Sequence, residues 1–250
     1  IIIPFFTSFI SPLLPALMRV VGYDVESLPI SNDVSAEWGL KYANNEVCYP
    51  ATLIIGDIIK AFKEGRYNPS EVAVGITQTG GQCRASNYLP MLKKALVDAG
   101  YTDTPVISLT FGDNLDNDQS AFKIDWVKML PIALRAVLYS DCINKMYHAA
   151  VVREKEAGMA NDLRVVYLQM GAELIEKGKS KELYQYLEIA TKEFNSICND
   201  IERPKVGVVG EIYLKFNSFA QRNIVDWLVE QHIEVVPSVL TDFFTQAFVN

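Results

Sequence analysis

Histidine and basic residues are scarce in this sequence. Only 2 of its 250 residues are histidine, and 23 lysines and arginines face 30 aspartates and glutamates, which gives a formal net charge of -7. A nucleic-acid-binding surface requires a concentrated basic face, so nucleic acid is not an expected partner. His148 and His232 have no metal-ligand partner at a suitable spacing, and we expect both to be surface or helix-cap residues.

The sequence also lacks a long uninterrupted apolar run. Its apolar opening, IIIPFFTSFISPLLPALMRVV, is broken by Pro4, Pro12, Pro15 and Arg19, and no basic stretch precedes it. This stretch is therefore expected to be neither a membrane span nor an export signal, and a membrane is not an expected partner. The first residue is not methionine and the final stretch, TDFFTQAFVN, is apolar, so we expect the chain to be part of a longer polypeptide.

Cysteine is sparse, and several common motifs are missing. The 4 cysteines lie far apart without a CxxC pair, which is typical of reduced thiols in a cytoplasmic protein rather than of a secreted disulfide scaffold. The sequence contains no Walker-type phosphate loop, dinucleotide-binding glycine pattern or nucleophilic serine elbow. ATP binding is therefore not assigned to these residues.

Residues 1–111 alternate short apolar runs with helical patterns. IIIPFF, YDVESLP, EVAVGITQT and PVISLTF are strand candidates, and helices are predicted around residues 12–21, 50–64 and 87–99. Alternating strands and helices joined by short turns predict an α/β fold. We expect a parallel, flavodoxin-like sheet with helices on both faces.

The pattern changes over residues 112–203, where three or four helical stretches follow one another. We expect this helical segment to pack on the α/β layer, and we interpret its charged stretch REKEAGMANDLR, residues 153–164, as a solvated face. After it, PKVGVVGEIYLKF, QRNIVDWLVEQH and IEVVPSVL predict a buried strand, a helix and another strand. Residues 204–250 are therefore expected to begin a second α/β lobe, truncated by the end of the chain.

The clearest chemical signal is TQTGGQC, residues 77–83, between an apolar strand and an amphipathic helix. Loops that follow the carboxyl ends of the strands in an open α/β sheet form the ligand crevice, and this stretch is one of them. Paired glycines can expose successive backbone N–H groups, which together with a helix start suit an anion. Cys83, with Arg84 beside it, should ionise readily there. The candidate cofactor-binding residues are Gly80, Gly81, Gln82, Arg84 and Asn87.

A second cysteine has a similar position. In NNEVCYPATLIIGDII, Cys48 precedes Pro50, which favours the first turn of a helix. Thiolates at the starts of two helices of one sheet can converge at its carboxyl edge, so Cys48 and Cys83 are candidate ligands of a metal or iron–sulfur site. A free cysteine more often packs as a small apolar residue, which is the favoured interpretation for Cys142 and Cys198.

Two other functions fit the same residues. The glycine loop can hold the phosphate or carboxylate of a small molecule on the backbone nitrogens of Gly81 and Gln82, with the cysteines incidental. Alternatively, the thiols of Cys48 and Cys83 form a redox-sensing disulfide. No catalytic residue is assigned under any of these interpretations.

The stretches NNEVCYPATLIIGDII, GITQTGGQCRASNYLPMLKKAL and PKVGVVGEIYLKF, in this order, resemble the 2-hydroxyacyl-CoA dehydratase D-component family. The similarity is greatest to the branch of large bacterial proteins named acyl-CoA dehydratase activase-related. It covers nearly the whole chain, and TQTGGQCRASNY is its most specific part.

The resemblance implies two flavodoxin-like lobes facing a cleft in which cysteines hold a 4Fe-4S cluster. It also implies that the cluster receives an electron from a fused or separate ATP-dependent activator. The protein would then be part of an enzyme of the lyase or reductase type that acts on an acyl-CoA or other small-molecule substrate. Cys48 and Cys83 match the two family cysteines of the first lobe. The family's third cluster cysteine matches no residue of this sequence, neither Cys142 nor Cys198, so these residues alone are not expected to hold a stable cluster.

Overall fold

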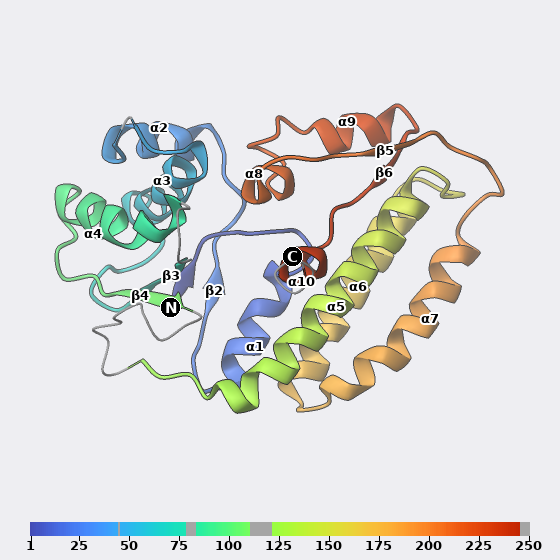
Figure 1. Cartoon of the computed structure of the whole chain (residues 1–250), viewed down its shortest axis with the longest axis horizontal. Coiled ribbons are helices and arrows are strands. Elements are labelled where there is room, and N and C mark those ends of the chain that lie inside the picture. The colour runs from blue at the N-terminus through green and yellow to red at the C-terminus, as the bar shows by residue number, and fades with distance from the viewer. Residues whose placement is uncertain (45, 79–83, 111–121, 246–250) are drawn as a thin grey trace. The chain divides into compact units, whose positions relative to one another are not determined.

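The computed structural model describes residues 1–44, 46–78, 84–110 and 122–245 of the chain. It divides into two compact units, one comprising Ile1–Phe6 and Asp24–Ile124, the other Thr7–Tyr23 and Asp125–Asn250 (Figure 1). The stretch Thr7–Tyr23 thus belongs to the same unit as the long helices that follow residue 124. In the described parts of the chain no helix is both long and apolar enough to cross a bilayer.

The first unit is built on a four-stranded parallel sheet. Its strand order is β2-β1-β3-β4, and β3 pairs with β4 from Val74 opposite Val106 to Gln78 opposite Thr110. This order matches the start of the flavodoxin-like arrangement and confirms the predicted α/β class. The strands are β1 (Ile2–Ile3), β2 (Glu26–Ser27), β3 (Val74–Gln78) and β4 (Val106–Thr110).

Three α-helices accompany this sheet in the described part of the first unit. Two were predicted, α3 (Tyr49–Lys63) and α4 (Tyr88–Asp98), the latter preceded by the 3-10 turn η2 (Arg84–Asn87). The third, α2 (Asp33–Tyr42), was missed. It begins with a capping box in which the Asn32 side chain accepts from the Ser35 backbone N–H and the Ser35 side chain accepts from the Asn32 N–H.

Helices α2 and α3 pack with their backbones in close contact. A Cβ atom built on Gly56 would lie 1.7 Å from the carbonyl oxygen of Ser35, and one on Gly39 would lie 2.0 Å from the carbonyl oxygen of Thr52. Only glycine fits at either position, because no side-chain rotation can move a backbone carbonyl away. The rest of α3 is almost entirely buried, which explains its strong apolar pattern.

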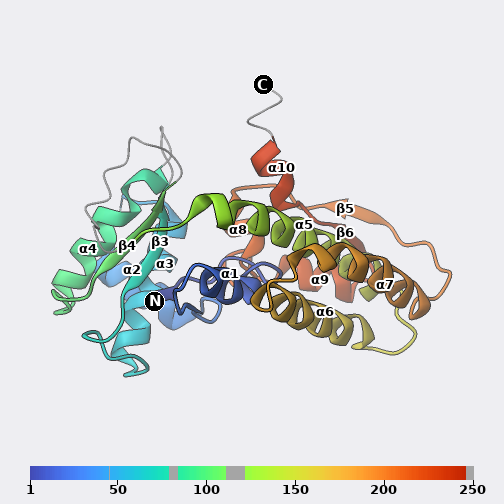
Figure 2. The same ribbon diagram turned by 90° about the horizontal axis from the view of Figure 1, so that it is seen from below.

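Long helices form most of the second unit (Figure 2). The predicted helical segment contains three of them, and the predicted helix around residues 12–21 is present as a 3-10 turn and α1, which packs on α6. These elements are η1 (Ser11–Leu13), α1 (Leu14–Val20), α5 (Trp126–Val151), α6 (Met159–Glu176), η3 (Ser180–Glu182) and α7 (Leu183–Ser196).

The second α/β lobe expected over residues 204–250 stays a prediction, and this stretch contains a short parallel pair, β5 (Lys205–Gly207) with β6 (Glu234–Val236). The expectation of one long buried strand over PKVGVVGEIYLKF is wrong, because β5 is exposed and the later residues form α8 (Ile212–Phe216). The Glu211 side chain caps that helix by accepting from the Leu214 N–H at 2.8 Å. The remaining helices are α9 (Ile224–Glu230) and α10 (Leu240–Thr245).

The two histidines behave differently from each other. His232 follows α9 in the left-handed region, with φ of 58°, and is exposed, as expected of a helix-cap residue. His148, expected at the surface, is instead only 7% exposed. Its ring lies against the rings of Phe9 and Tyr147, at centroid distances of 5.8 and 5.0 Å. The expectation for His148 was wrong because helical spacing around this residue carries no information about its contact with Phe9.

Candidate cysteine site at the carboxyl edge of the sheet

Cys48 is the N-cap residue of α3. Its backbone is extended, with φ of -69° and ψ of 151°, and its carbonyl oxygen accepts from the N–H groups of Ala51 and Thr52 at 3.0 and 3.3 Å. Pro50 lies in the first turn, where its missing N–H costs nothing. The thiol is half-buried. The sequence expectation that Cys48 begins a helix is therefore confirmed.

The Cys48 thiol contacts the start of a second helix. Its Sγ lies 3.0 Å from the hydroxyl oxygen of Tyr88, the first residue of α4. Helix α4 follows β3, and α3 precedes it, so in a parallel sheet both helices begin at the edge where β3 ends. The contact places Cys48 at this carboxyl edge, beside the helix that follows the TQTGGQC loop. Tyr88 was not singled out from the sequence, although its position at the start of α4 was a usable signal.

Most of the other predicted site residues lie outside the described part of the chain: Gly80, Gly81, Gln82 and Cys83. Arg84 is the first residue of η2. Asn87 is exposed and is the N-cap residue of α4, with φ of -104° and no side-chain hydrogen bond to the helix. The pairing of Cys48 with Cys83 therefore stays a prediction.

The remaining cysteines belong to the second unit. Cys142, in α5, and Cys198, after α7, are both half-buried, and burial raises the pKa of each thiol. The Cys198 thiol donates to the carbonyl oxygen of Phe194 at 3.1 Å. Both thiols are thus held in their neutral form, unlike a metal-bound thiolate. Among the described residues, no group of three or more histidine, cysteine, aspartate or glutamate side chains could hold a metal ion.

A 4Fe-4S cluster fits the chemistry of the described residues at this edge only in part. Cys48 offers the sulfur donor that such clusters require, and the Tyr88 hydroxyl can donate a hydrogen bond to it. Hydrogen bonds to ligand sulfur adjust the potential of these clusters. The first unit has one other cysteine in its sequence, Cys83, which lies outside the described residues and is the candidate for a second thiolate.

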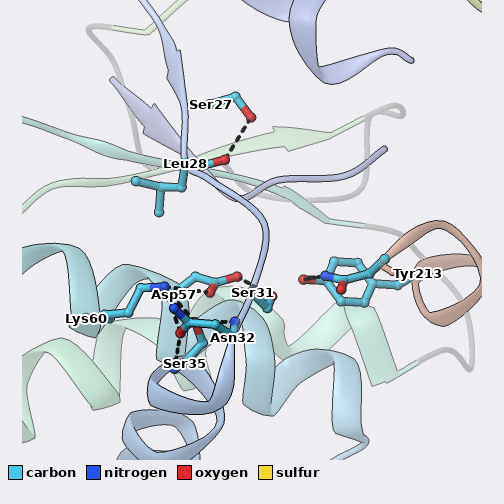
Figure 3. Close-up of polar contacts among 9 residues, drawn as sticks. Ser27, Leu28, Ser31, Asn32, Ser35, Asp57, Lys60 and Tyr213 are labelled. Atoms are coloured by element: carbon cyan, nitrogen blue, oxygen red, sulfur yellow. Dashed lines mark hydrogen bonds and ion pairs between the residues drawn. The ribbon is translucent and has the colours of Figure 1, made fainter. Parts of the chain in front are cut away.

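A buried polar cluster also joins α2 to α3 (Figure 3). The Lys60 ammonium donates to Ser35 Oγ at 2.8 Å and to Asn32 Oδ1 at 3.2 Å, and it lies 3.9 Å from Asp57 Oδ1. The Ser31 hydroxyl donates to Asp57 Oδ2 at 2.7 Å. Burial raises the pKa of Asp57 to about 6, although the Ser35 and Ser31 hydroxyls and Lys60 oppose the rise. Four of its five members are buried and only Asn32 is exposed, so we assign this cluster to fixing α2 on α3.

Comparisons with known proteins add no relative to this description, since no family model, no curated protein and no solved structure matches the chain. The fold is shown by the structure itself. The family and the activity have to be argued from the residues.

Proposed function

We propose that the first unit is the cysteine-bearing α/β lobe of an acyl-CoA dehydratase or reductase system of the 2-hydroxyacyl-CoA dehydratase type. Cys48 and Cys83 would each supply one thiolate to a 4Fe-4S cluster that accepts a low-potential electron from an ATP-dependent activator. The observation that carries the proposal is the 3.0 Å contact between Cys48 Sγ and Tyr88 Oη. It brings the start of α3 beside the helix that follows the TQTGGQC loop.

The chain's own residues have separate tasks in this proposal. Cys48 presents sulfur at the start of α3, where the helix dipole favours a negative charge. The Tyr88 hydroxyl donates to that sulfur and holds its orientation. As expected from the sequence, backbone N–H groups at Gly80 and Gly81 would stabilise the charge of the second thiolate. When bound, the cluster would supply one-electron transfer.

Anaerobic reconstitution with iron and sulfide tests the ligand set. It should use the polypeptide that carries these residues, compared with its Cys48→Ser, Cys83→Ser and Cys142→Ser variants. We expect the first two to lose most of the bound iron and the electron paramagnetic resonance signal of the reduced cluster. Cys142→Ser is the matched control and should retain both. Unchanged iron content in Cys48→Ser or Cys83→Ser would contradict the proposal.

Proximity of the two thiols can be tested without iron. We expect mild oxidation with diamide to join Cys48 to Cys83. Such a bridge would show that their Cα atoms lie within about 7 Å of each other. Peptide mass spectrometry identifies the bridge, and Cys142 and Cys198 should remain free. A Cys48–Cys83 bridge without any iron uptake would instead favour the thiol redox sensor. Absence of the bridge would contradict the thiol redox sensor, whereas two ligands of one cluster can lie too far apart to bridge directly, so the iron content of the variants decides the cluster.

A further inference from the structure

The second unit contains a cavity, lined by both polar and apolar residues, that none of the functions above uses. Its volume is about 110 Å³, and it is lined by the stretch before η1, by α5 and α6, and by residues of the β5–β6 region. Its polar lining includes Asn144, His148, Arg164, Lys215, Gln221 and Asp226. All these residues belong to one compact unit, so the cavity does not depend on the first unit.

Three side-chain atoms of this lining are buried without a hydrogen-bond partner. They are Asn144 Oδ1, Arg164 Nε and Gln221 Oε1, and in the part of the chain that the structure describes only one further atom, Asp57 Oδ1, shares this condition. Asn144 is only 4% exposed. Buried polar atoms in native proteins are almost always paired, so their concentration around one cavity indicates a polar occupant.

The aromatic wall holds one of the two cationic side chains of this cavity, Arg164, in place. The Arg164 guanidinium lies over the rings of Phe9 and Tyr147, at 5.6 and 5.2 Å from their centroids, and Arg164 Nη2 donates to Asn161 Oδ1. Within the described residues, Arg164 forms no ion pair with a carboxylate. Its unpaired Nε–H can therefore donate to the carboxylate of a ligand. Arg164 is the last residue of the stretch REKEAGMANDLR, whose sequence pattern predicts a solvated face.

His148 adds an uncharged acceptor. Its Nδ1 lies 2.9 Å from the carbonyl oxygen of Asn144, and because a carbonyl can only accept, Nδ1 carries the proton. Burial lowers the pKa of His148, which keeps the ring neutral and leaves Nε2 as an acceptor. The cavity thus combines the unpaired Arg164 Nε–H and the Lys215 ammonium with the acceptors Asn144 Oδ1 and Gln221 Oε1 and the nearby Asp226 carboxylate.

We propose that this cavity binds a small amino acid zwitterion. The carboxylate would accept from Arg164 Nε, and the ammonium would donate to Asn144 Oδ1 and Gln221 Oε1. An apolar cavity of about 150 Å³ accommodates benzene. The smaller volume here favours a ligand of the size of glycine, alanine or serine. Acetate and methylammonium each carry only one of the two charged groups and would leave one part of the lining unpaired.

Titration of the ¹⁵N-labelled chain with glycine, observed by amide chemical shifts, tests this proposal. Glycine should shift signals of Asn144 and its neighbours saturably, and acetate and methylammonium should bind at least about tenfold more weakly, as expected for the loss of a charge-assisted hydrogen bond. Gln221→Met should weaken glycine binding by about tenfold. Gln231→Met, at the exposed C-cap of α9, makes the same change outside the cavity and should have no effect.

Two results would overturn the proposal. The first is equal affinity for glycine and acetate, because then Asn144 and Gln221 do not recognise an amine. The second is that glycine, alanine and serine all fail to cause saturable chemical-shift changes at millimolar concentration. This result would show that the cavity is filled only by water. If Gln221→Met does not fold, Arg164→Lys provides the second variant, because it keeps the charge but removes Nε–H and should weaken glycine and acetate alike.

Discussion

Replacing Gly56 by alanine should destabilise the first unit, although helix propensity alone predicts the opposite. An alanine in the interior of a helix is about 1 kcal/mol more favourable than glycine. In α3, however, the added Cβ would lie 1.7 Å from the Ser35 carbonyl oxygen and 2.8 Å from the Gly39 backbone nitrogen. Both neighbours are backbone atoms, so relief requires α2 and α3 to move apart.

The size of the effect follows from what this movement would disrupt. Overpacking a well-packed interface costs about 1–3 kcal/mol, occasionally more. Separation of the helices would also weaken the 2.8 Å hydrogen bond from Lys60 to Ser35, and a buried polar group that loses its partner costs about 1–3 kcal/mol. After subtracting the propensity gain, we expect the free energy of unfolding of this unit to fall by about 1–5 kcal/mol.

Urea unfolding followed by Trp38 fluorescence measures this change. Trp38 lies in α2, so a background with Trp126→Phe and Trp227→Phe isolates the signal of the first unit. The control is Gly65→Asn, because Gly65 has φ of 68°, which asparagine tolerates, and open space around its Cβ direction. The control should remain within about 0.5 kcal/mol of the parent protein. If Gly56→Ala were neutral or stabilising, the close α2–α3 contact would be refuted.

The other predictions concern buried carboxylates. Burial raises the pKa of Asp57 from 3.8 to about 6, so the folded state binds this proton more tightly than the unfolded state. The free energy of unfolding should therefore fall by about 3 kcal/mol as the pH rises from below 4 to above 6. Urea titrations should show this component in the parent and not in Asp57→Asn. In the second unit, Asp141 accepts from the N–H groups of Leu240 and Thr241 at 2.9 and 2.8 Å. Asp141→Ala should therefore speed hydrogen exchange of α10, and unchanged exchange would show that other contacts hold this helix.

Whether a helix could be predicted from the sequence depended on which of its residues are buried. Helix α3 was predicted to within one residue because it buries an apolar stripe along its length. Helix α2 was missed because its buried residues include Ser35 and Gly39, whereas Val34 and Leu40 are 39% and 65% exposed. A helix that packs through small residues carries no apolar period, and only its capping box could have revealed it.

The candidate sites could be predicted from the sequence only where their residues belong to a local feature. Cys48 could be proposed from the sequence because a helix start is a local feature, and the parallel sheet order follows from the alternation of elements. The cavity of the second unit could not, since Phe9, Asn144, Arg164 and Gln221 are far apart in the chain and none belongs to a motif. Arg164 in particular has the sequence context of a solvated residue, and only the rings of Phe9 and Tyr147 give it a site.

The close contact of α2 and α3 has a consequence for Cys48. This residue directly precedes α3 and follows the short connection from α2, so its position is set by how these two helices meet. Their backbones touch at Gly39 and Gly56, and the Lys60 cluster joins them again through Ser35. A ligand side chain must be held by its surroundings if it is to bind at a defined geometry. The glycines and the buried lysine therefore support the thiol from one side, and the Tyr88 hydroxyl orients it from α4.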